Sequence, residues 1–553
     1  MIRLISLILI SWLVPWALGD SPQNLDVLIT GARVVDGSGN PWYSADVGIR
    51  AGIIVAIGNL KGQKAIRVID ANGLVLAPGF IDMMGESTLP LLLDPVTAQS
   101  KLRQGVTTMM AGEGTSLAPQ NELTIQELNL PPDIPHWESF RQYNQLLEAK
   151  GLGLNVIHNV GAAQVRRVVM GDVNRAPTPH ELIRMQHLVS LAMDDGAAGL
   201  STALIYPPGA YANTEELIDL AKISSEHGGL YFTHMRNESD HLLEAIEETI
   251  RIGGAAHLPV HIYHLKAAGE ENWPLMRKAL ARIERARDSG IDVSADVYPY
   301  IRNGLGLSSF VNSTHFGSGA EAFLSTLSDP KARQALKQEI ENTSDWENWY
   351  QHVGRNWANV LVVQVPTGVD KRYEGKSIEE IAKIRVQNTW DTFFDLVQKG
   401  PVEVDPKTMD ENQKELALKS RFVSISSDSG PMNPTVSTYA HPRTFGTFAR
   451  ILAKYVREEG IIDLEDAIRE MTSLAANQLR LLNRGRIGIG MAADVVLFDS
   501  KLVKDTATFE RPMSYAIGME YVLVNGQLVI DHGDPTGVTA GVVIRANKQN
   551  ALR

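Results

Sequence analysis

Leu230-Tyr-Phe-Thr-His234 and Pro259-Val-His-Ile-Tyr-His264 are two short runs of β-prone residues, and each run ends in a histidine. The residues between them, from Asp240 to Ile252, have the pattern of an amphipathic helix, which Gly253-Gly254 brings to an end. A strand, a helix and a second strand in this order predict a βαβ unit, whose two strands run parallel.

The same succession continues on both sides of this unit. Asn213-Thr-Glu-Glu216 resembles a capping box, in which Asn213 accepts from a backbone N–H and Glu216 reaches back, and the helix is expected to run to His227. Further strands are expected at Asp292-Val-Ser-Ala-Asp-Val-Tyr298 and at Phe422-Val-Ser-Ile-Ser-Ser-Asp428. The predicted fold class is therefore α/β, a (β/α)₈ TIM-like barrel.

Polar residues stand at the carboxyl ends of these expected strands: His234, His264, Tyr298 and Asp428. In a barrel of this kind all strand ends converge on one face, where active sites are built. Four such residues together predict a functional site on that face.

Both ends of the chain lack the strand–helix alternation of the middle and consist of short β-rich runs separated by glycine-containing turns. They predict a small β-sandwich domain formed from both termini, comprising residues 25–76 and 487–545. The barrel is then expected to span residues 77–486.

The N-terminus has one basic residue, Arg3, then an apolar run from Leu4 to Leu18, then Gly19-Asp20-Ser21. This pattern is typical of a secretory signal peptide, here residues 1–19, and predicts export to the periplasm or the medium. The apolar run is shorter than the ~20 residues that a spanning helix needs, so no stable membrane insertion is expected after cleavage.

The composition limits the partners and the metal ligands that this chain can have. The chain has 553 residues and a net charge of -12, which argues against a nucleic-acid partner, because phosphates attract Lys and Arg. It has no cysteine, which excludes disulfides, thiolate ligands and Cys nucleophiles. A metal ion must be held by His, Asp or Glu.

His234 and His264 suit a divalent cation such as zinc, because neutral imidazoles from neighbouring strands are good ligands. Asp428 has the chemistry of a general base, although Asp beside Ser and Gly is also typical of a turn or a helix N-cap. Four further residues are candidate substrate anchors, with ordinary surface ion pairing as the alternative for the two arginines. These anchors are Tyr206, Arg236, Lys266 and Arg443.

Several longer motifs resemble the D-aminoacylase (N-acyl-D-amino-acid deacylase) family. The resemblance runs from about Leu25 to Val543. The motifs are Val75-Leu-Ala-Pro-Gly-Phe-Ile-Asp82, Gly105-Val-Thr-Thr108, Gly199-Leu-Ser-Thr-Ala-Leu-Ile-Tyr-Pro-Pro-Gly209, Thr233-His-Met-Arg-Asn-Glu238, His264-Leu-Lys266, His441-Pro-Arg443, Met471-Thr-Ser473 and Gly485-Arg486-Ile487 followed by Gly490-Met-Ala-Ala-Asp494.

The resemblance implies a zinc hydrolase with His234 and His264 as metal ligands and Asp428 as the general base. It also implies that the substrate carboxylate and the reacting carbonyl are gripped by Lys266, Tyr206, Tyr298 and Arg443. An insertion over the barrel mouth is expected within about residues 303–421.

The sequence departs from the family in three places. Met84 and Glu86 replace the His-x-His pair, Gly112-Glu113-Gly114 replaces Asn-Cys-Gly, and Gly161-Ala162 replaces Gly-His. A thioether does not replace imidazole for a cation such as zinc, so a two-metal site is not expected. One zinc ion held by the two histidines and a glutamate is expected instead. Glu113 is the first candidate for that glutamate, and Glu86 is the second or a supporting partner.

The expected function is hydrolysis of an amide bond in an N-acyl amino acid, with the D configuration as one option, or in a small peptide. The substrate is then a small molecule with a carboxylate and an amide. One alternative is a non-catalytic descendant that binds such molecules, with the glutamates simply paired to Lys266 or Arg236. Another is an enzyme for cyclic amides. The acyl group and the oligomeric state are left open.

Overall fold

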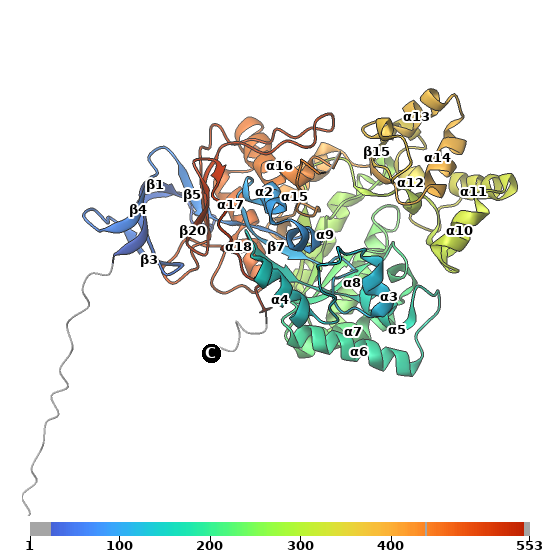
Figure 1. Ribbon diagram of the computed structural model, residues 1–553, viewed down its shortest axis with the longest axis horizontal. Helices are drawn as coiled ribbons and strands as arrows, with labels where there is room; N and C mark the ends of the chain where they lie inside the picture. Colours follow the sequence, from blue (N-terminus) through green and yellow to red (C-terminus); the bar gives the residue numbers. More distant parts are fainter. Residues whose placement is uncertain (1–23, 437–438, 547–553) are drawn as a thin grey trace, which may run out of the picture.

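The computed structural model describes residues 24–436 and 439–546. The predicted signal peptide lies outside these residues. No helix within them is long and apolar enough to cross a membrane. Figure 1 shows three regions side by side: a β-rich region at one end, a central α/β region, and a mainly helical region at the other end.

The β-rich region combines both ends of the described chain. Its nine strands form a single sheet in the order β21-β20-β19-β18-β5-β1-β2-β3, with β4 also paired to β1. The first strands are β1 (Leu25–Val34), β2 (Tyr43–Arg50), β3 (Ile53–Gly58), β4 (Ala65–Asp70) and β5 (Val75–Pro78). The last strands are β18 (Val495–Phe498), β19 (Met519–Val524), β20 (Gln527–Asp531) and β21 (Asp534–Pro535).

The link between the two ends is the antiparallel pair of β5 and β18. Alternate residues of these strands, such as Leu76 and Leu497, point into a buried apolar cluster. The expected sandwich of two sheets differs from the structure in one respect: hydrogen bonding is continuous from β21 to β3, because β1 pairs with β2, β4 and β5.

The central region holds parallel strands in two sheets, ordered β6-β7-β8 and β17-β13-β12-β11-β10-β9. Backbone hydrogen bonds join the sheets at both ends, from Ala198 N to His158 O (2.8 Å) and from Met83 N to Ile425 O (3.5 Å). The strands are β6 (Phe80–Asp82), β7 (Val106–Ala111), β8 (Asn155–His158), β9 (Val160–Gly161), β10 (Gly199–Ala203), β11 (Leu230–His234), β12 (Val260–Ile262), β13 (Val293–Val297) and β17 (Val423–Ile425).

Helices connect these strands and cover the sheet, as the strand–helix alternation of the sequence predicts. In Figure 1, α6, α7 and α8 lie along one edge of the central region. The connecting helices are α5 (Ala162–Met170), α6 (Pro179–Asp194), α7 (Thr214–Glu226), α8 (Leu242–Ala256), α9 (Leu275–Asp288), α15 (Glu411–Leu418), α16 (Arg443–Arg450), α17 (Leu464–Met471) and α18 (Ser473–Gln478). Short helices between β6 and β8 are α1 (Leu89–Leu93), α2 (Gln99–Leu102), α3 (Glu122–Glu127) and α4 (Phe140–Lys150).

Helix α7 shows half of the expected capping box. The Asn213 side chain accepts from Glu216 N at 2.9 Å, as predicted. The Glu216 carboxylate does not reach back to the cap, because both of its oxygens accept from Arg166 at 2.7 Å. The Glu216 side chain therefore forms a buried ion pair with Arg166 instead of the second contact of the capping box.

The third region lies between β13 and β17 and has a hydrophobic cluster of its own, from Leu305 to Val404. It contains a three-stranded sheet, ordered β14-β16-β15, and helices that Figure 1 shows in yellow and orange, away from the β-rich end. Its elements are β14 (Leu305–Gly306), β15 (Val360–Gln364), β16 (Glu403–Pro406), α10 (Ala320–Thr326), α11 (Pro330–Asn342), α12 (Trp349–His352), α13 (Ile378–Arg385) and α14 (Thr389–Gln398).

Candidate metal centre and active site

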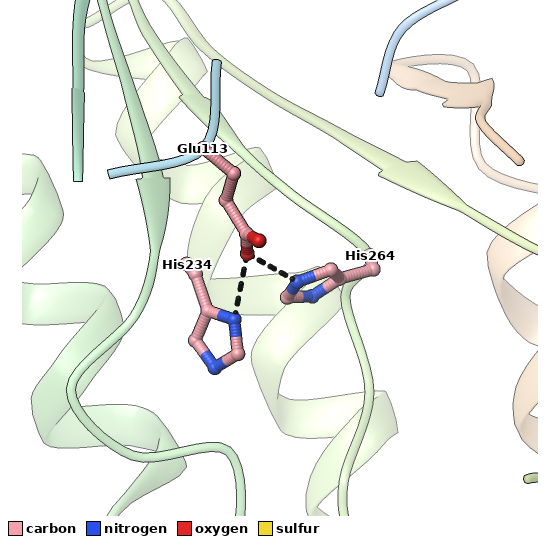
Figure 2. Close-up of side chains that lie close together, drawn as sticks. All are labelled: Glu113, His234 and His264. Carbon is pink, nitrogen blue, oxygen red and sulfur yellow. Dashed lines mark hydrogen bonds and ion pairs between the residues drawn. The ribbon is translucent and has the colours of Figure 1, made fainter. Parts of the chain in front are cut away.

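Glu113, His234 and His264 come together at the carboxyl ends of the parallel strands, and one ligand atom from each lies within 4.8 Å of the other two. His234 is the last residue of β11, His264 follows β12, and Glu113 follows β7. Figure 2 shows the Glu113 carboxylate between the two imidazoles. Its Oε1 lies 2.8 Å from His234 Nδ1 and 3.1 Å from His264 Nε2.

These residues fit a divalent cation. Two imidazoles and one carboxylate match the three protein ligands of catalytic zinc sites, which leave a fourth position open. Burial alone raises the pKa of Glu113, but its hydrogen bonds with His234 and His264 outweigh burial and hold that pKa well below the ordinary value. The carboxylate is therefore in the ionised form that binds metal.

A second carboxylate, Glu238, faces the other side of both imidazoles. Its Oε1 lies 3.0 Å from His264 Nδ1, and its Oε2 lies 3.6 Å from His234 Nε2. Metal-binding histidines usually direct their second nitrogen to such a carboxylate, which fixes the ring. Glu238 therefore orients the His264 ring, whereas His234 Nε2 is buried without a hydrogen-bond partner among the described residues. Glu238 ends the motif Thr233-His-Met-Arg-Asn-Glu238, but no pattern in the sequence predicts this role for it.

Glu86 lines the same recess but is not part of the three-residue cluster. It has a left-handed backbone, with φ of 61°, in the loop after β6. Burial, reinforced by the nearby carboxylates of Glu113 and Asp428, raises the pKa of Glu86 to about 8. The structure therefore groups Glu113 with the histidines and places Glu86 beside them.

Asp428 follows β17 and also lines the recess, with a left-handed backbone at φ of 50°. Arg443 Nη1 donates to its carboxylate. Burial raises the pKa of Asp428, while Arg443 and His264 act in the opposite direction. A carboxylate facing the histidine cluster from another strand end has the position that a general base needs.

A buried network fixes the backbone next to Asp428. Lys101 Nζ donates to Asp82 Oδ2 at 2.8 Å and to Ser427 Oγ at 2.5 Å. Asp82 Oδ1 accepts from Ser427 N at 2.8 Å. Lys101 and Asp82 are fully buried, so this pair holds the end of β17 against β6 and thereby positions Asp428.

Of the predicted anchors, Lys266 and Tyr206 line the recess. Lys266 Nζ donates to both oxygens of Glu238 at 2.7 Å. The Tyr206 ring meets His234 edge-on, with 5.6 Å between centroids. Lys266 and Arg443 both lie over the ring of Tyr298. Lys266 Nζ is 5.9 Å from the ring centroid, and Arg443 Cζ is 4.9 Å from it.

Arg236 lies apart from the recess. Its guanidinium donates to Glu248 at 3.0 Å and to the carbonyl oxygens of Ala210 and Ala212. It holds α8 to the loop before α7, which is the structural role that the sequence analysis gave as the alternative for this residue.

The third region completes the wall of the recess with residues that the sequence analysis missed. They are Asn303, Gly304, Leu305 and Trp349. Gly304 is packed so closely that a Cβ there would meet Arg443 Nη2 at 2.8 Å. These residues come from a segment without clear periodicity, so no sequence pattern connects them to the strand ends.

Comparisons with known proteins identify the family to which the chain belongs. Residues 67–530 match the model of the Amidohydrolase family. D-aminoacylase from Alcaligenes xylosoxydans xylosoxydans is 35% identical over 534 residues, which cover 94% of this chain and 98% of that protein.

Two solved structures are similar over nearly their whole length. N-acyl-D-glutamate deacylase from Bordetella bronchiseptica, complexed with zinc and a phosphonate inhibitor, is 30% identical with a TM-score of 0.80, covering 95% of this chain and 100% of that one. A D-aminoacylase studied for the role of its binuclear metal centre is 33% identical with a TM-score of 0.78, covering 94% and 100%. The chain therefore belongs to the amidohydrolase family, and within it to the group of D-aminoacylases and N-acyl-D-amino-acid deacylases.

Proposed function

We propose that this chain hydrolyses the amide bond of N-acyl-D-amino acids, or of small peptides with a free carboxylate, with one zinc ion bound per chain. The observation that carries the proposal is the cluster of Glu113, His234 and His264, with Asp428 facing it in the same recess. The relatives, a D-aminoacylase and an N-acyl-D-glutamate deacylase, support the D configuration.

The ligand set favours a single zinc ion. Glu113, His234 and His264 would hold it, and Glu238 would keep the His264 ring in place. Met84 offers only a thioether where a second ion would need an imidazole. When bound at such a site, zinc polarises a carbonyl oxygen and lowers the pKa of a water molecule.

Asp428 is the residue proposed to move the proton. Its carboxylate takes the proton of the attacking water and gives it to the departing nitrogen, so that the amine leaves in neutral form. Arg443 donates to Asp428 in this structure. Its guanidinium has paired N–H donors, whose spacing also matches the carboxylate of a substrate. Lys266, held by Glu238, adds positive charge on the same side of the recess.

Three broader features belong to the same proposal. Counting β8 and β9 together, the central region has eight parallel strands within the described residues, and the hydrogen bonds at both sheet ends support a closed (β/α)₈ barrel. The paired terminal segments support a separate β-domain of residues 25–76 and 487–545. The apolar N-terminal run supports export.

The proposal is tested by zinc content and by turnover of N-acetyl-D-amino acids. We expect about one zinc per chain, because the donor set matches one catalytic site. Both zinc and activity should be lost in Glu113→Ala, whereas Glu86→Gln should keep the metal. Two ions per chain, or metal loss in Glu86→Gln but not in Glu113→Ala, would contradict the single-ion site. A zinc-loaded protein without turnover would make the chain a binding protein instead.

A further inference from the structure

A second cavity adjoins the candidate site and is much larger than it. The recess around the histidines encloses about 40 Å³, which is little more than the ~30 Å³ that one water molecule occupies in the liquid. The second cavity encloses about 280 Å³ and shares Glu86 and Glu113 with the recess. Its other walls come from the loops after β6, β7 and β8 and from the ends of α3 and α4.

The cavity lies on the opposite side of the strand ring from Lys266. In the order β6, β7, β8–β9, β10, β11, β12, β13, β17, the strand β7 stands across from β12 and β8 stands across from β13. Lys266 follows β12, whereas the cavity opens after β7 and β8 and has Arg167 as its own basic lining residue. A substrate with its carboxylate at Lys266 and its amide at the histidines therefore extends its acyl group toward the cavity.

We propose that this cavity, the acyl chamber, binds the acyl group of the substrate, and that the acyl group it fits contains an amide of its own. The enzyme would then release the last residue from a short peptide or an N-acyl dipeptide. This inference rests on the proposed function, and it adds the class of acyl group.

The volume supports an acyl group well beyond acetyl. At ~30 Å³ for each non-hydrogen atom, taken as the size of a water molecule, the chamber has room for about nine such atoms. An acetyl group has three of them and would leave most of the chamber filled with water. An N-acetylglycyl group or a hexanoyl group has seven.

The polarity of the walls favours the peptide-like group over the alkyl chain. Polar side chains line the cavity beside the apolar ones, and they are Thr115, Ser116, Gln120, Asn159 and Gln164. Hydroxyl and amide groups of this kind can pair with the N–H and C=O of a bound amide, whereas an alkyl chain offers them no partner. Burial lowers the pKa of His158 to about 3, so its ring is neutral and suits a neutral amide.

The apolar walls define where the carbon atoms of that group pack. They are Leu89, Leu117, Leu128 and Phe140. Phe140 also stacks on the His158 ring, with 5.3 Å between centroids, so that apolar and polar surfaces alternate over a short distance. A mixed surface of this kind matches a peptide unit, which has both, better than a uniform alkyl chain.

The experiment compares kcat/KM for three derivatives of D-leucine: N-acetyl, N-hexanoyl and N-acetylglycyl. We expect the N-acetylglycyl compound to exceed N-acetyl by at least about tenfold, and to exceed N-hexanoyl, because only it both fills the chamber and offers an amide to the polar walls. Equal values for all three would overturn the acyl chamber, and a preference for N-hexanoyl would overturn its peptide-like character.

Leu128→Trp places a larger side chain in the chamber and should lower the ratio of N-acetylglycyl to N-acetyl turnover about fivefold or more. Leu123→Trp is the matched control, because Leu123 lies on the same helix with 71% exposure and does not line the chamber. Leu128→Phe serves if the tryptophan variant does not fold. A ratio unaffected by filling the chamber in a folded variant would contradict the inference. Failure of all three substrates would overturn the proposed function itself, and the inference with it.

Discussion

Glu238 shows how one side chain can organise a site without being a ligand. It is fully buried, accepts twice from Lys266, and faces the outer nitrogens of His234 and His264. One carboxylate thus lies next to Lys266 and both histidines. Its position links the candidate ligands to the candidate substrate anchor.

Replacing Glu238 should therefore affect metal binding from outside the ligand set. We expect Glu238→Gln to weaken zinc binding by about 10–100-fold, because the His264 ring loses the carboxylate that orients it. Zinc affinity is measured by competition with a chelator of known affinity. Glu248→Gln is the control, since Glu248 pairs with Arg236 away from the recess, and its zinc affinity should stay unchanged. An unchanged affinity in Glu238→Gln would show that the rings are fixed by other contacts.

The sequence allowed the strand-end residues to be predicted but not their partners. His234 and Asp428 stand at the end of apolar runs, and strand ends are visible in the pattern of buried residues. Glu238 is in a loop four residues after His234, where no periodicity applies. Arg236, two residues after the same histidine, is a predicted substrate anchor with ion pairing as the alternative, and its guanidinium pairs with Glu248. Loop geometry decides between such neighbours.

At the scale of elements, α7 illustrates a competition between local and long-range contacts. The Asn213 cap was predictable because it depends on residues within one turn. The partner of Glu216 was not, because Arg166 comes from α5, and an ion pair buried between two helices outweighs a capping contact.

The contributions of the cap and of the ion pair to the free energy of unfolding can be compared by mutation. Asn213→Ala should cost about 1 kcal/mol, the usual value of an N-cap. Arg166→Met should cost about 3–5 kcal/mol, because it leaves the Glu216 carboxylate buried and unpaired. Urea unfolding of both variants measures the difference. If Asn213→Ala were the more damaging change, the ion pair would not be the dominant contact of this helix.

At the scale of the molecule, the β-rich region depends on strands from both ends of the chain. The segments that form this region were predictable, because the residues near Leu25 and near Ile530 have the same pattern of short β-rich runs. The order of their strands was not predictable. Pairing partners so far apart in sequence are set by how the central region brings them together. The same reason explains why a two-sheet sandwich was expected where the strands make one sheet.

The C-terminal strands should accordingly be needed for a stable protein. Beyond the sheet, Gly541 N donates to Leu152 O at 2.7 Å and Ile544 N donates to Val156 O at 2.8 Å, which ties the end of the described chain to β8. A chain that stops at residue 490 should be insoluble or melt far earlier than the full protein. Supplying residues 491–546 as a separate chain should restore soluble protein. A truncated chain with an unchanged melting temperature would contradict this.

The pairing of β5 with β18 also fixes a sequence of events during synthesis. β5 leaves the ribosome early, whereas β18 follows only after the whole central region has been made. Until then the β5 edge has open N–H and C=O groups, and such edges recruit strands from other chains. The period of greatest aggregation risk is therefore the middle of translation. A cell that makes this protein in quantity has to shield that edge, by chaperones or by slow synthesis, until the last strands arrive.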